Sequence, residues 1–360
     1  MKAPLKVGLI GCGHIASAHI KAWHMSGLGG VECVYDVNRT VAQQFASKFG
    51  VASAAPTLSD LLNRVDVVDD CSPPGAHLGN ALKAFEAECH YLSEKPIVLT
   101  EEDLNRILRA RLAAKRELCV VHNLKFSPAV LKAKRWVDQD RIGGLLTLES
   151  HFLTHSSTDR MLRAQNHWSA ELPGGRWIET LPHDLYLGFD FLGPLELDRV
   201  TTVCPPIGWE RPETPEEALI VFKGPESLAI NRYSARSQVS LRSFVLYGTE
   251  GTVHVDTLAG SARATRRRDS PWIRGMGGDS LDALTTLKGM IPDRFSMLAS
   301  RIRGESPHSM LIGQFARYLL GQGPSPVTLD EIVYVVRNTE RIGKLLTTQA
   351  RSRDRASVTG

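Results

Sequence analysis

The sequence lacks the cysteine pattern of a metal or disulfide site. It contains six cysteines, and none forms a C-x-x-C pair. Most of them lie in or beside runs that are typical of buried strands. Their positions are Cys12, Cys33, Cys71, Cys89, Cys119 and Cys204. We interpret them as small apolar residues in a reducing cytoplasm, and we expect neither a bound metal nor a structural disulfide.

Long apolar runs, internal repeats and a strong charge of one sign are missing as well. No apolar stretch approaches the ~20 residues that a membrane helix needs, so we expect no membrane association. The formal net charge of the 360 residues is only +4, which gives no general affinity for nucleic acid or acidic lipid. The first residues lead straight into a strand pattern, so no secretory signal is expected.

The first third of the chain alternates strand-like and helical patterns. The strand-like runs are Lys6–Ile10, Val31–Tyr35, Val65–Asp69, His90–Ser93 and Leu118–His122. The helical patterns are His14–Met25, Thr40–Phe49, His77–Glu88 and Thr100–Arg116. This alternation predicts an α/β domain over residues 1–123, with a parallel, doubly wound sheet of the Rossmann type. The strand ends then line one edge of the sheet, where such folds bind ligands.

After residue 123 the pattern favours longer, alternating strands. They are Leu145–Thr154, Ala218–Lys223, Leu228–Ser234, Leu241–Tyr247 and Thr252–Asp256. We predict an α+β domain over residues 124–360 with a mostly antiparallel, open-faced sheet for substrate binding and oligomerisation. An open sheet face needs a partner, so a homodimer or homotetramer is expected.

Several helices and loops complete the predicted second domain. A helix is expected to begin at Pro182 and to continue over His183–Leu192, because proline is tolerated at a helix start. Helical patterns also cover Met310–Leu320 and Leu329–Leu346, and the polar tail after Thr347 is expected to fray. The Arg-rich segment Ala262–Gly278 is interpreted as a solvated loop or subunit contact rather than a nucleic-acid site.

A glycine-rich turn follows the first strand and opens the first helix. In this G-x-G-x-x-A pattern, Gly11 permits the tight turn, Gly13 lets the backbone approach a pyrophosphate, and Ala16 keeps the helix close to the strand. Backbone N–H groups at His14, Ile15 and Ala16 can then hold phosphates at the helix N-terminus. The turn predicts a dinucleotide site, although the pattern alone also fits a strand–helix turn without a ligand.

Two residues near the end of the second strand bear on the choice of dinucleotide. Asp36 stands where a carboxylate binds the ribose hydroxyls of NAD. The 2′-phosphate of NADP would meet this negative charge, but Arg39 lies nearby and can offset it. We therefore expect NAD and keep NADP as the alternative.

Further motifs recur in a fixed order along the chain. They are Asp66–His77, Glu94-Lys95-Pro96, Asn123–Pro128, Gly174-Gly175 with Glu179 and His183, and Gly248–Gly251. With the glycine turn, the set resembles the glucose–fructose oxidoreductase, inositol dehydrogenase and MocA family (Gfo/Idh/MocA) over residues 6–346. The resemblance implies an NAD(P)-dependent oxidoreductase that acts on a sugar, polyol or sugar derivative.

The resemblance also implies roles for particular residues. Lys95 matches the family's active-site lysine near the nicotinamide, followed by a proline that in relatives comes after a cis bond. His183 matches the catalytic histidine, whose unperturbed pKa of about 6.5 suits proton transfer with a hydroxyl. Glu179 stands where the family usually has Asp, and it is taken as a third catalytic residue that orients the imidazole. Tyr186 replaces a second Asp of many relatives.

Other residues are expected around the cofactor and substrate. By the same resemblance, Ser72, Pro73, His77, Glu94 and Asn123 join Lys95 beside the cofactor. The predicted substrate contacts are Lys125, His167, Arg176, Trp177 and Asp184. Lys125 replaces an Arg of the family, so it keeps the charge but loses the planar fork of donors. For Arg176, Trp177 and His167, packing and surface charge are the alternative.

The predicted reaction is reversible hydride transfer between nicotinamide and a carbinol or carbonyl carbon. Two alternatives stay open. One is an NAD-dependent glycosidase that oxidises a sugar transiently, as some relatives do, and the other is an NAD-binding regulatory protein without catalysis. The change from Asp to Glu at position 179 and the proline at 182 motivate the second alternative.

Overall fold

The chain folds into two compact units. The computed structural model describes residues 4–163, 168–203, 214–266 and 305–358. Among these, the first unit comprises 4–126 with 305–340, and the second comprises the remainder. The predicted boundary after residue 123 lies close to this division. The assignment of 305–340 to the second domain was wrong, because these residues belong to the first unit.

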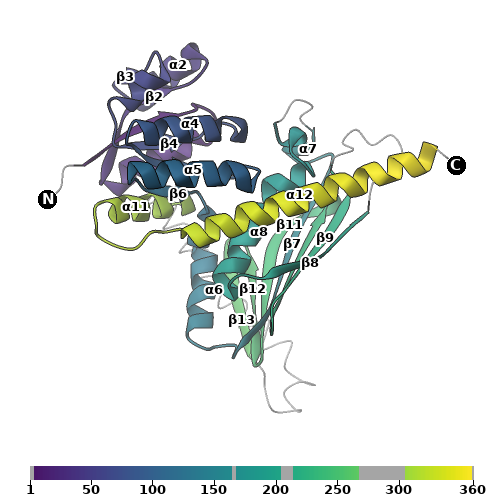
Figure 1. Cartoon of the computed structure of the whole chain (residues 1–360). Helices are drawn as coiled ribbons and strands as arrows, with labels where there is room; N and C mark the ends of the chain where they lie inside the picture. The colour runs from purple at the N-terminus through teal and green to yellow at the C-terminus, as the bar shows by residue number, and fades with distance from the viewer. Residues whose placement is uncertain (1–3, 164–167, 204–213, 267–304, 359–360) are drawn as a thin grey trace, which may run out of the picture. The chain divides into compact units, whose positions relative to one another are not determined.

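The first unit contains a six-stranded parallel sheet in the order β3-β2-β1-β4-β5-β6, as predicted for a doubly wound fold. Figure 1 shows helices α4 and α5 lying over the sheet. The strands are β1 (Leu5–Ile10), β2 (Gly29–Tyr35), β3 (Ser53–Ala54), β4 (Val67–Asp70), β5 (His90–Ser93) and β6 (Leu118–Val120). The helices are α1 (Ala16–Ser26), α2 (Arg39–Phe49), α3 (Leu58–Leu62), α4 (Pro74–Glu86), α5 (Glu101–Ala114), η1 (Asn123–Phe126) and α11 (Pro307–Leu319).

Local sequence signals explain where these helices begin and end. The side chain of Asn38 accepts from the backbone N–H of Thr40 and Val41 at the start of α2, and Gly50 follows the helix with φ +68°. The Thr100 side chain accepts from the Asp103 N–H at the start of α5. The helix ends are therefore set by capping residues that the sequence already displays.

Helix α11 belongs to the first unit because its apolar face lies in that core. Leu311, Ile312 and Phe315 are fully buried, in one cluster with Trp23 of α1. Burial of such side chains stabilises the folded state by about 1.5–3 kcal/mol each. This packing brings α11 to α1 although the two helices are far apart in the sequence. The periodicity of residues 310–320 predicted the helix but not its partner.

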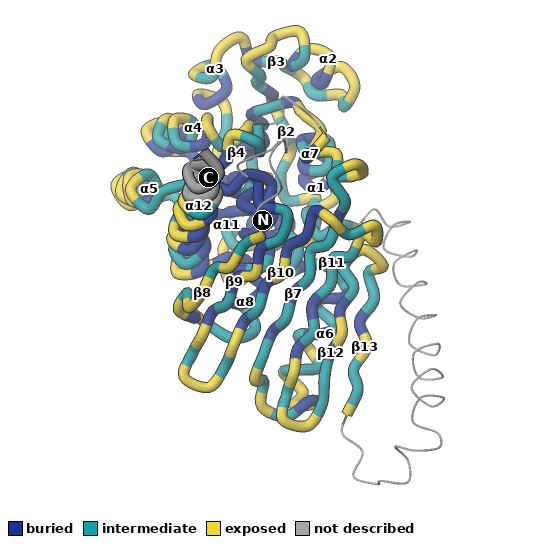
Figure 2. The backbone as a smooth tube through the Cα atoms, turned by 90° about the vertical axis from the view of Figure 1, so that its right-hand side faces the viewer, coloured by how far each residue is buried: buried dark blue, intermediate teal, exposed yellow. Residues whose placement is uncertain are grey.

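The second unit is built on a seven-stranded sheet in the order β13-β12-β11-β7-β10-β9-β8. Only the β7–β10 pair in this described sheet is parallel, so the predicted mostly antiparallel arrangement is confirmed. Figure 2 shows these strands side by side, with intermediate and exposed residues alternating with buried ones along them. The strands are β7 (Leu145–His155), β8 (Glu196–Val203), β9 (Glu217–Lys223), β10 (Leu228–Ser234), β11 (Arg236–Gly248), β12 (Gly251–Asp256) and β13 (Ser261–Arg266).

The helices of the second unit are α6 (Pro128–Asp138), α7 (Arg160–Arg163), η2 (Trp168–Glu171) and α8 (Arg176–Leu192). Helix α12 (Leu329–Val358) supplies residues to both units. It continues past Thr347, where fraying was expected, because its sequence holds neither glycine nor proline between 344 and 358. Strand β13 also corrects the prediction of a loop from Ala262, since it pairs with β12 as far as Arg266.

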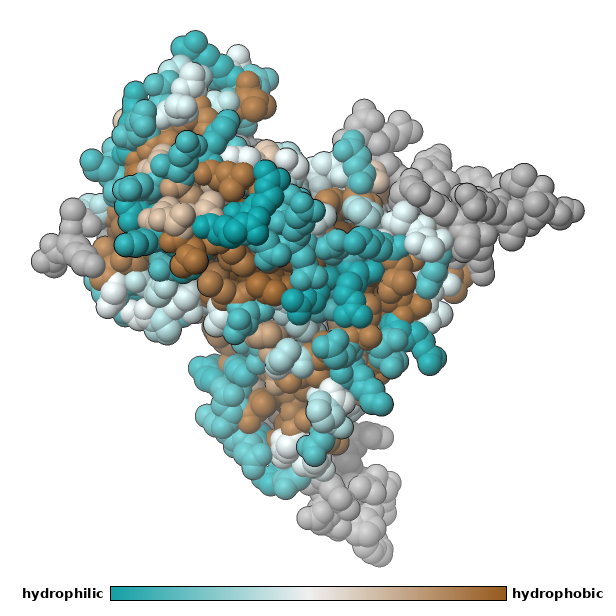
Figure 3. Space-filling view, viewed as in Figure 1, coloured by the Kyte–Doolittle hydropathy of each residue, from teal (hydrophilic) through white to brown (hydrophobic). Residues whose placement is uncertain are grey.

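The surface, the helices and the cysteine side chains have the following features. In Figure 3, hydrophobic residues are interspersed with polar ones on the face shown. None of the helices within the described ranges is long and apolar enough to cross a bilayer. The cysteines at 12, 33, 71, 89 and 119 are buried and free, as expected of small apolar residues, while Cys204 lies outside the described residues.

Candidate cofactor-binding and catalytic residues

The glycine turn has the local geometry of a phosphate cradle. Gly11 has φ +81°, and a Cβ built there would lie 2.7 Å from the backbone nitrogen of Ser72, so only glycine fits. A Cβ on Gly13 would meet no atom within 4 Å, which leaves open space on the turn. Among the described residues, no hydrogen-bond acceptor pairs with the N–H groups of Gly13, His14 or Ile15. These donors suit a pyrophosphate at the start of α1.

Asp36 ties the end of β2 to this turn. One carboxylate oxygen accepts from the Cys12 N–H at 2.9 Å, and the other accepts from the Asn38 N–H at 2.8 Å. Burial, with the charge of Asp36 as a second cause, raises the pKa of the Cys12 thiol to about 12. Each carboxylate oxygen keeps lone pairs for ribose hydroxyls. Arg39, the first residue of α2, is exposed.

Two aspartates end β4, and they serve opposite sides of it. Asp70 is fully buried and accepts from the backbone and hydroxyl of Ser72, from Asn80 and from the Tyr91 hydroxyl at 2.5 Å. Burial, and then the charge of Asp70, raises the pKa of Tyr91 well above its usual value. This network fixes the Ser72 loop, and Pro73 follows as the exposed residue that precedes α4.

His77 anchors the loop that follows β5. Its Nδ1 lies 3.0 Å from the Pro96 carbonyl oxygen, and its Nε2 lies 2.8 Å from the carbonyl oxygen of Ser72. The ring is fully buried. The Lys95–Pro96 peptide bond is cis, as the resemblance implied. His77 therefore holds this loop in place, and the structure shows no surface on its ring for a ligand.

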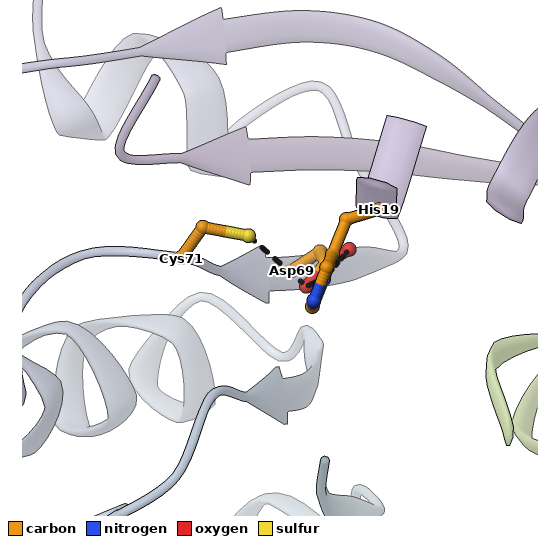
Figure 4. A group of neighbouring side chains, drawn as sticks. All are labelled: His19, Asp69 and Cys71. Carbon is orange, nitrogen blue, oxygen red and sulfur yellow. Dashed lines mark hydrogen bonds and ion pairs between the residues drawn. The ribbon is translucent and has the colours of Figure 1, made fainter. Parts of the chain in front are cut away.

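Asp69 points to the other side of β4, where it meets α1. Figure 4 shows the His19 imidazole and the Cys71 thiol both directed at the Asp69 carboxylate. His19 Nδ1 lies 2.9 Å from Asp69, and Trp23 donates to Asp69 at 2.8 Å. On its other side, His19 Nε2 lies 3.0 Å from Glu94, the residue before Lys95.

These contacts set the charges of the network. Burial by itself would lower the pKa of His19, but the Asp69 charge more than reverses this and raises the pKa well above its usual value. Burial would raise the pKa of Glu94, yet hydrogen bonds from His19 and His308 hold it well below its usual range. The core of the first unit thus holds a positive ring between two carboxylates.

Asn123 and Lys125 follow β6 on the short helix η1. The Asn123 side-chain amide lies 3.1 Å from His308 Nε2. Lys125 donates to Glu331 of α12 at 2.6 Å, and the same carboxylate lies 2.6 Å from His122 Nδ1. Because Glu331 is 2% exposed and the Lys125 side chain 12%, this lysine forms a buried ion pair rather than an open substrate contact.

In the second unit, α8 carries the candidate general base. The helix runs through Pro182, so the expectation that a helix begins there was wrong. Its residues from Arg176 to Gly188 are buried apart from Asp184, and this packing compensates for the one backbone bond that proline removes. His183 is 7% exposed, and its Nδ1 lies 2.6 Å from the Tyr186 hydroxyl one turn later.

The Glu179 carboxylate is hydrogen-bonded to neighbouring residues of the same helix, among them Arg176 at its start. Its carboxylate accepts from Arg176 at 2.5 Å and from Thr180 at 3.2 Å. Arg176 also pairs with Asp159 at 3.2 Å, and all three charged side chains are no more than 10% exposed. The structure thus gives Arg176 a packing role that joins the α7 region to α8.

The other predicted substrate residues have different surroundings. Trp177 is fully buried and donates to the Pro215 carbonyl at 2.7 Å, so the packing alternative fits it. Asp184 accepts from the Tyr233 hydroxyl at 2.6 Å, and burial raises the pKa of its carboxyl. His167 lies outside the described residues, as do Arg267, Arg268, Trp272 and Arg274 of the Arg-rich segment.

Sequence reasoning missed several polar residues that support the first unit's site. They are His19, Asp69, Asp70, His308 and Glu331. A signal for two of them was present, because Val67–Asp70 is a fully buried strand that ends in adjacent carboxylates. Buried charges need partners, and Asp69 finds them on α1 while Asp70 finds them in Asn80 of α4 and Tyr91 of β5. No local pattern indicates which residues of distant helices will meet them.

Comparisons with known proteins match both units. The sequence model described as "Oxidoreductase family, NAD-binding Rossmann fold" (GFO_IDH_MocA) matches residues 5–123, and the "GFO/IDH/MocA C-terminal domain" matches residues 130–254. Oxidoreductase P35 of Formosa agariphila is 26% identical over 205 residues, covering 54% of this chain and 63% of that protein. Levoglucosan dehydrogenase of Pseudarthrobacter phenanthrenivorans is 29% identical over 169 residues, covering 43% and 42%. The matched part is thus less than two thirds of either relative.

Solved structures share the fold over nearly the whole chain. A levoglucosan dehydrogenase in complex with NADH gives a TM-score of 0.75 at 16% identity, covering 97% of this chain and 98% of that one. The WlbA dehydrogenase from Bordetella pertussis, in complex with NADH and UDP-GlcNAcA, gives 0.71 at 19% identity, covering 94% and 96%. At these identities the likeness establishes the fold.

Proposed function

Because the chain belongs to the Gfo/Idh/MocA oxidoreductase family, with its NAD-binding Rossmann fold, we propose that it is an NAD-dependent dehydrogenase or reductase. Its substrate is a sugar, a polyol or a sugar derivative with a reactive CH–OH group. The observation that carries the proposal is the shared sheet edge of the first unit. There the glycine turn, Asp36 and Lys95 come after β1, β2 and β5 of the same parallel sheet.

The residues of this edge are suited to hold the dinucleotide. Amides of the turn at Gly13, His14 and Ile15 face a phosphate, and Asp36 accepts from ribose hydroxyls. The carboxylate favours NAD, whereas Arg39 leaves NADP as a weaker alternative. Ser72, Pro73 and Asn123 border the cofactor in this proposal, while His77 and Glu94 act by holding the loops that do so.

In the proposed reaction, the protein transfers a proton to or from the substrate and the cofactor exchanges the hydride. When bound, the nicotinamide supplies the hydride acceptor or donor. His183 takes the proton from the substrate hydroxyl and returns it in the reverse direction. Lys95 donates a hydrogen bond to the reacting oxygen. Glu179 holds Arg176 at the start of α8, so we assign it a supporting role.

The substrate class follows from the relatives. Levoglucosan dehydrogenase, UDP-N-acetylglucosamine 3-dehydrogenase and inositol 2-dehydrogenase all carry names of enzymes that oxidise a sugar or polyol hydroxyl. Of the predicted substrate contacts, Asp184 and Lys125 are already engaged by Tyr233 and Glu331.

A substrate panel tests the proposed function. The chain is incubated with NAD+ and with sugars, polyols, glycosides and nucleotide sugars, and NADH is followed by absorbance while glycoside cleavage is followed by chromatography. We expect net NADH from at least one substrate. Cleavage without net NADH would favour the glycosidase alternative, and NADH binding without any turnover would favour the regulatory one.

The open face of the second sheet supports self-association. Leu146, Leu219, Leu228 and Tyr247 on its strands are large hydrophobic residues that are 37–42% exposed. We propose a homodimer or homotetramer that covers this face, in a reducing compartment such as the cytoplasm that suits the buried thiols. Light scattering at several concentrations tests the assembly, and a monomer at all of them would contradict it.

A further inference from the structure

His19 bridges two carboxylates within the core of the first unit. The imidazole is fully buried, with Nδ1 at 2.9 and 3.0 Å from the Asp69 oxygens and Nε2 at 3.0 Å from Glu94 Oε1. Ionised carboxylates only accept hydrogen bonds, so a ring that satisfies both must donate from both nitrogens. Such charge-assisted bonds are about twice as strong as neutral ones and set the orientation of both partners.

The second oxygen of Glu94 leads to the candidate catalytic loop. Glu94 Oε2 accepts from the backbone N–H of Lys95 at 3.1 Å. The next carbonyl groups, those of Pro96 and Ile97, lie 3.0 and 3.2 Å from His77 Nδ1. Glu94 thus holds the backbone N–H of Lys95, and His77 holds the Pro96 and Ile97 carbonyl groups that come after it. The orientation of Glu94 in turn depends on His19.

The contacts that begin at the Lys95 backbone and pass through Glu94 and His19 lead to α1, the helix that follows the glycine turn. His19 comes three residues after Ala16, the first residue of α1, and Trp23 lies one turn further along. Both side chains bond Asp69, which is fully buried at the end of β4. His308 of α11 adds a second contact, at 3.7 Å from Glu94 Oε1. One face of α1 therefore links the turn to the loop that carries Lys95.

We propose that His19 is a positioning residue that fixes the backbone of Lys95, through Glu94, in register with the helix that begins at the glycine turn. This inference rests on the proposed function, because positioning matters only if Lys95 acts on the substrate. His19 itself touches neither substrate nor cofactor in this proposal. Misplacement of a catalytic group by about 1 Å can lower a rate by about 100-fold, which sets the scale of the effect.

Two substitutions separate the two bonds of the ring. The amide nitrogen of asparagine lies near the position of Nδ1, so His19→Asn keeps a donor for Asp69 and loses the one for Glu94. The amide nitrogen of glutamine lies near Nε2, so His19→Gln keeps the donor for Glu94. Both remove the same positive charge from the core, so their losses of thermal stability are expected to be similar. The two variants are therefore matched in charge and differ in which carboxylate keeps its donor, Asp69 in His19→Asn and Glu94 in His19→Gln.

We expect His19→Asn to lower kcat by about 100-fold and His19→Gln to lower it by less than about 5-fold, while NADH affinity stays within about 3-fold in both. Equal losses of kcat in the two variants would mean that the ring is only structural, and unchanged kcat in both would mean that Lys95 needs no such support. Either result, or a larger loss in the glutamine variant, overturns the proposal.

A measurement without turnover separates this proposal from the proposed function. In the wild-type chain with 15N-labelled histidine, we expect both nitrogens of His19 to carry slowly exchanging protons. The Lys95 amide should exchange faster in His19→Asn than in His19→Gln. An unprotonated Nε2, or equal exchange at Lys95, contradicts the inference even if the enzyme is active. A panel without turnover would instead count against the proposed function.

Discussion

The two units hold their candidate catalytic side chains by different means. In the first, the loop of Lys95 is fixed by ionised groups in the core, with Glu94 bonded to its backbone and His19 bonded to Glu94. In the second, His183 sits on a buried helix and meets the neutral hydroxyl of Tyr186 on that same helix. Charged buried networks are costly to break, whereas a single neutral bond is worth about 0.5–1.5 kcal/mol. The first unit should therefore be the more sensitive to mutation of supporting residues.

The largest effect is expected from the two catalytic candidates themselves, one from each unit. Lys95→Met and His183→Ala should each lower kcat by about 10²–10⁴-fold, since each removes a group that handles the substrate proton or oxygen. NADH affinity should change little. Lys83→Met and His24→Ala, which alter exposed residues, are the controls. Full turnover in either catalytic variant would refute its assignment.

Two glycine substitutions in the turn test whether one glycine serves the stability of the first unit and the other serves NADH binding. Gly11→Ala should destabilise the fold by about 1–3 kcal/mol, because alanine is strained at φ +81° and its Cβ would meet the backbone of Ser72. Gly13→Ala enters open space, so it should leave the melting temperature unchanged but weaken NADH binding by about tenfold. Calorimetry and NADH fluorescence measure the two. Unaltered NADH affinity in Gly13→Ala would remove the turn from the cofactor site.

The substitution Asp36→Asn tests whether this carboxylate determines the preference for NAD+ over NADP+. Asparagine keeps an oxygen for the Cys12 N–H but loses the charge, so stability should change little. Affinity for NAD+ should fall by about tenfold, which corresponds to ~1.4 kcal/mol, and the preference for NAD+ over NADP+ should shrink. Isothermal titration with both cofactors gives the ratio. An unchanged ratio would mean that Asp36 serves only the turn.

The smallest effects are expected in the second unit, where two substitutions on α8 can be compared. Tyr186→Phe removes the hydroxyl at Nδ1 of His183 and should lower kcat by about 3–10-fold, the equivalent of one neutral hydrogen bond. Glu179→Gln loosens the contact with Arg176 and should lower the melting temperature more than kcat. The reverse ranking, with kcat lowered more by Glu179→Gln, would restore Glu179 as the residue that orients the imidazole.

The sequence was informative where one local pattern decides the structure. The strand–turn–helix at Gly11–Ala16, the cap at Thr100 and the alternation of strands in the second unit all depend on neighbours in the chain. Helix α8 shows the limit, because Pro182 is a local signal for a helix start and tertiary burial overrode it. The helix of residues 307–319 was predicted, but its membership of the first unit was not.

The candidate site divides in the same way. Asp36 and the turn were predicted because each directly follows a strand, whereas Lys95 was predicted from the family resemblance of Glu94-Lys95-Pro96. The partners that hold them could not, because His19, His308 and Glu331 come from helices whose packing no local pattern specifies. For Trp177 the sequence left substrate contact and packing both open, and the residue is fully buried with its indole N–H bonded to the Pro215 carbonyl.

The most direct test of the account is the fate of a labelled hydride. The chain is given NADH that carries deuterium at both C4 positions, together with the carbonyl form of a substrate from the panel, and the alcohol product is examined by mass spectrometry. The account predicts one deuterium at the carbinol carbon of the product in the wild type, and greatly slowed labelling in His183→Ala. Conversion of the substrate with all the label left in the cofactor would contradict it.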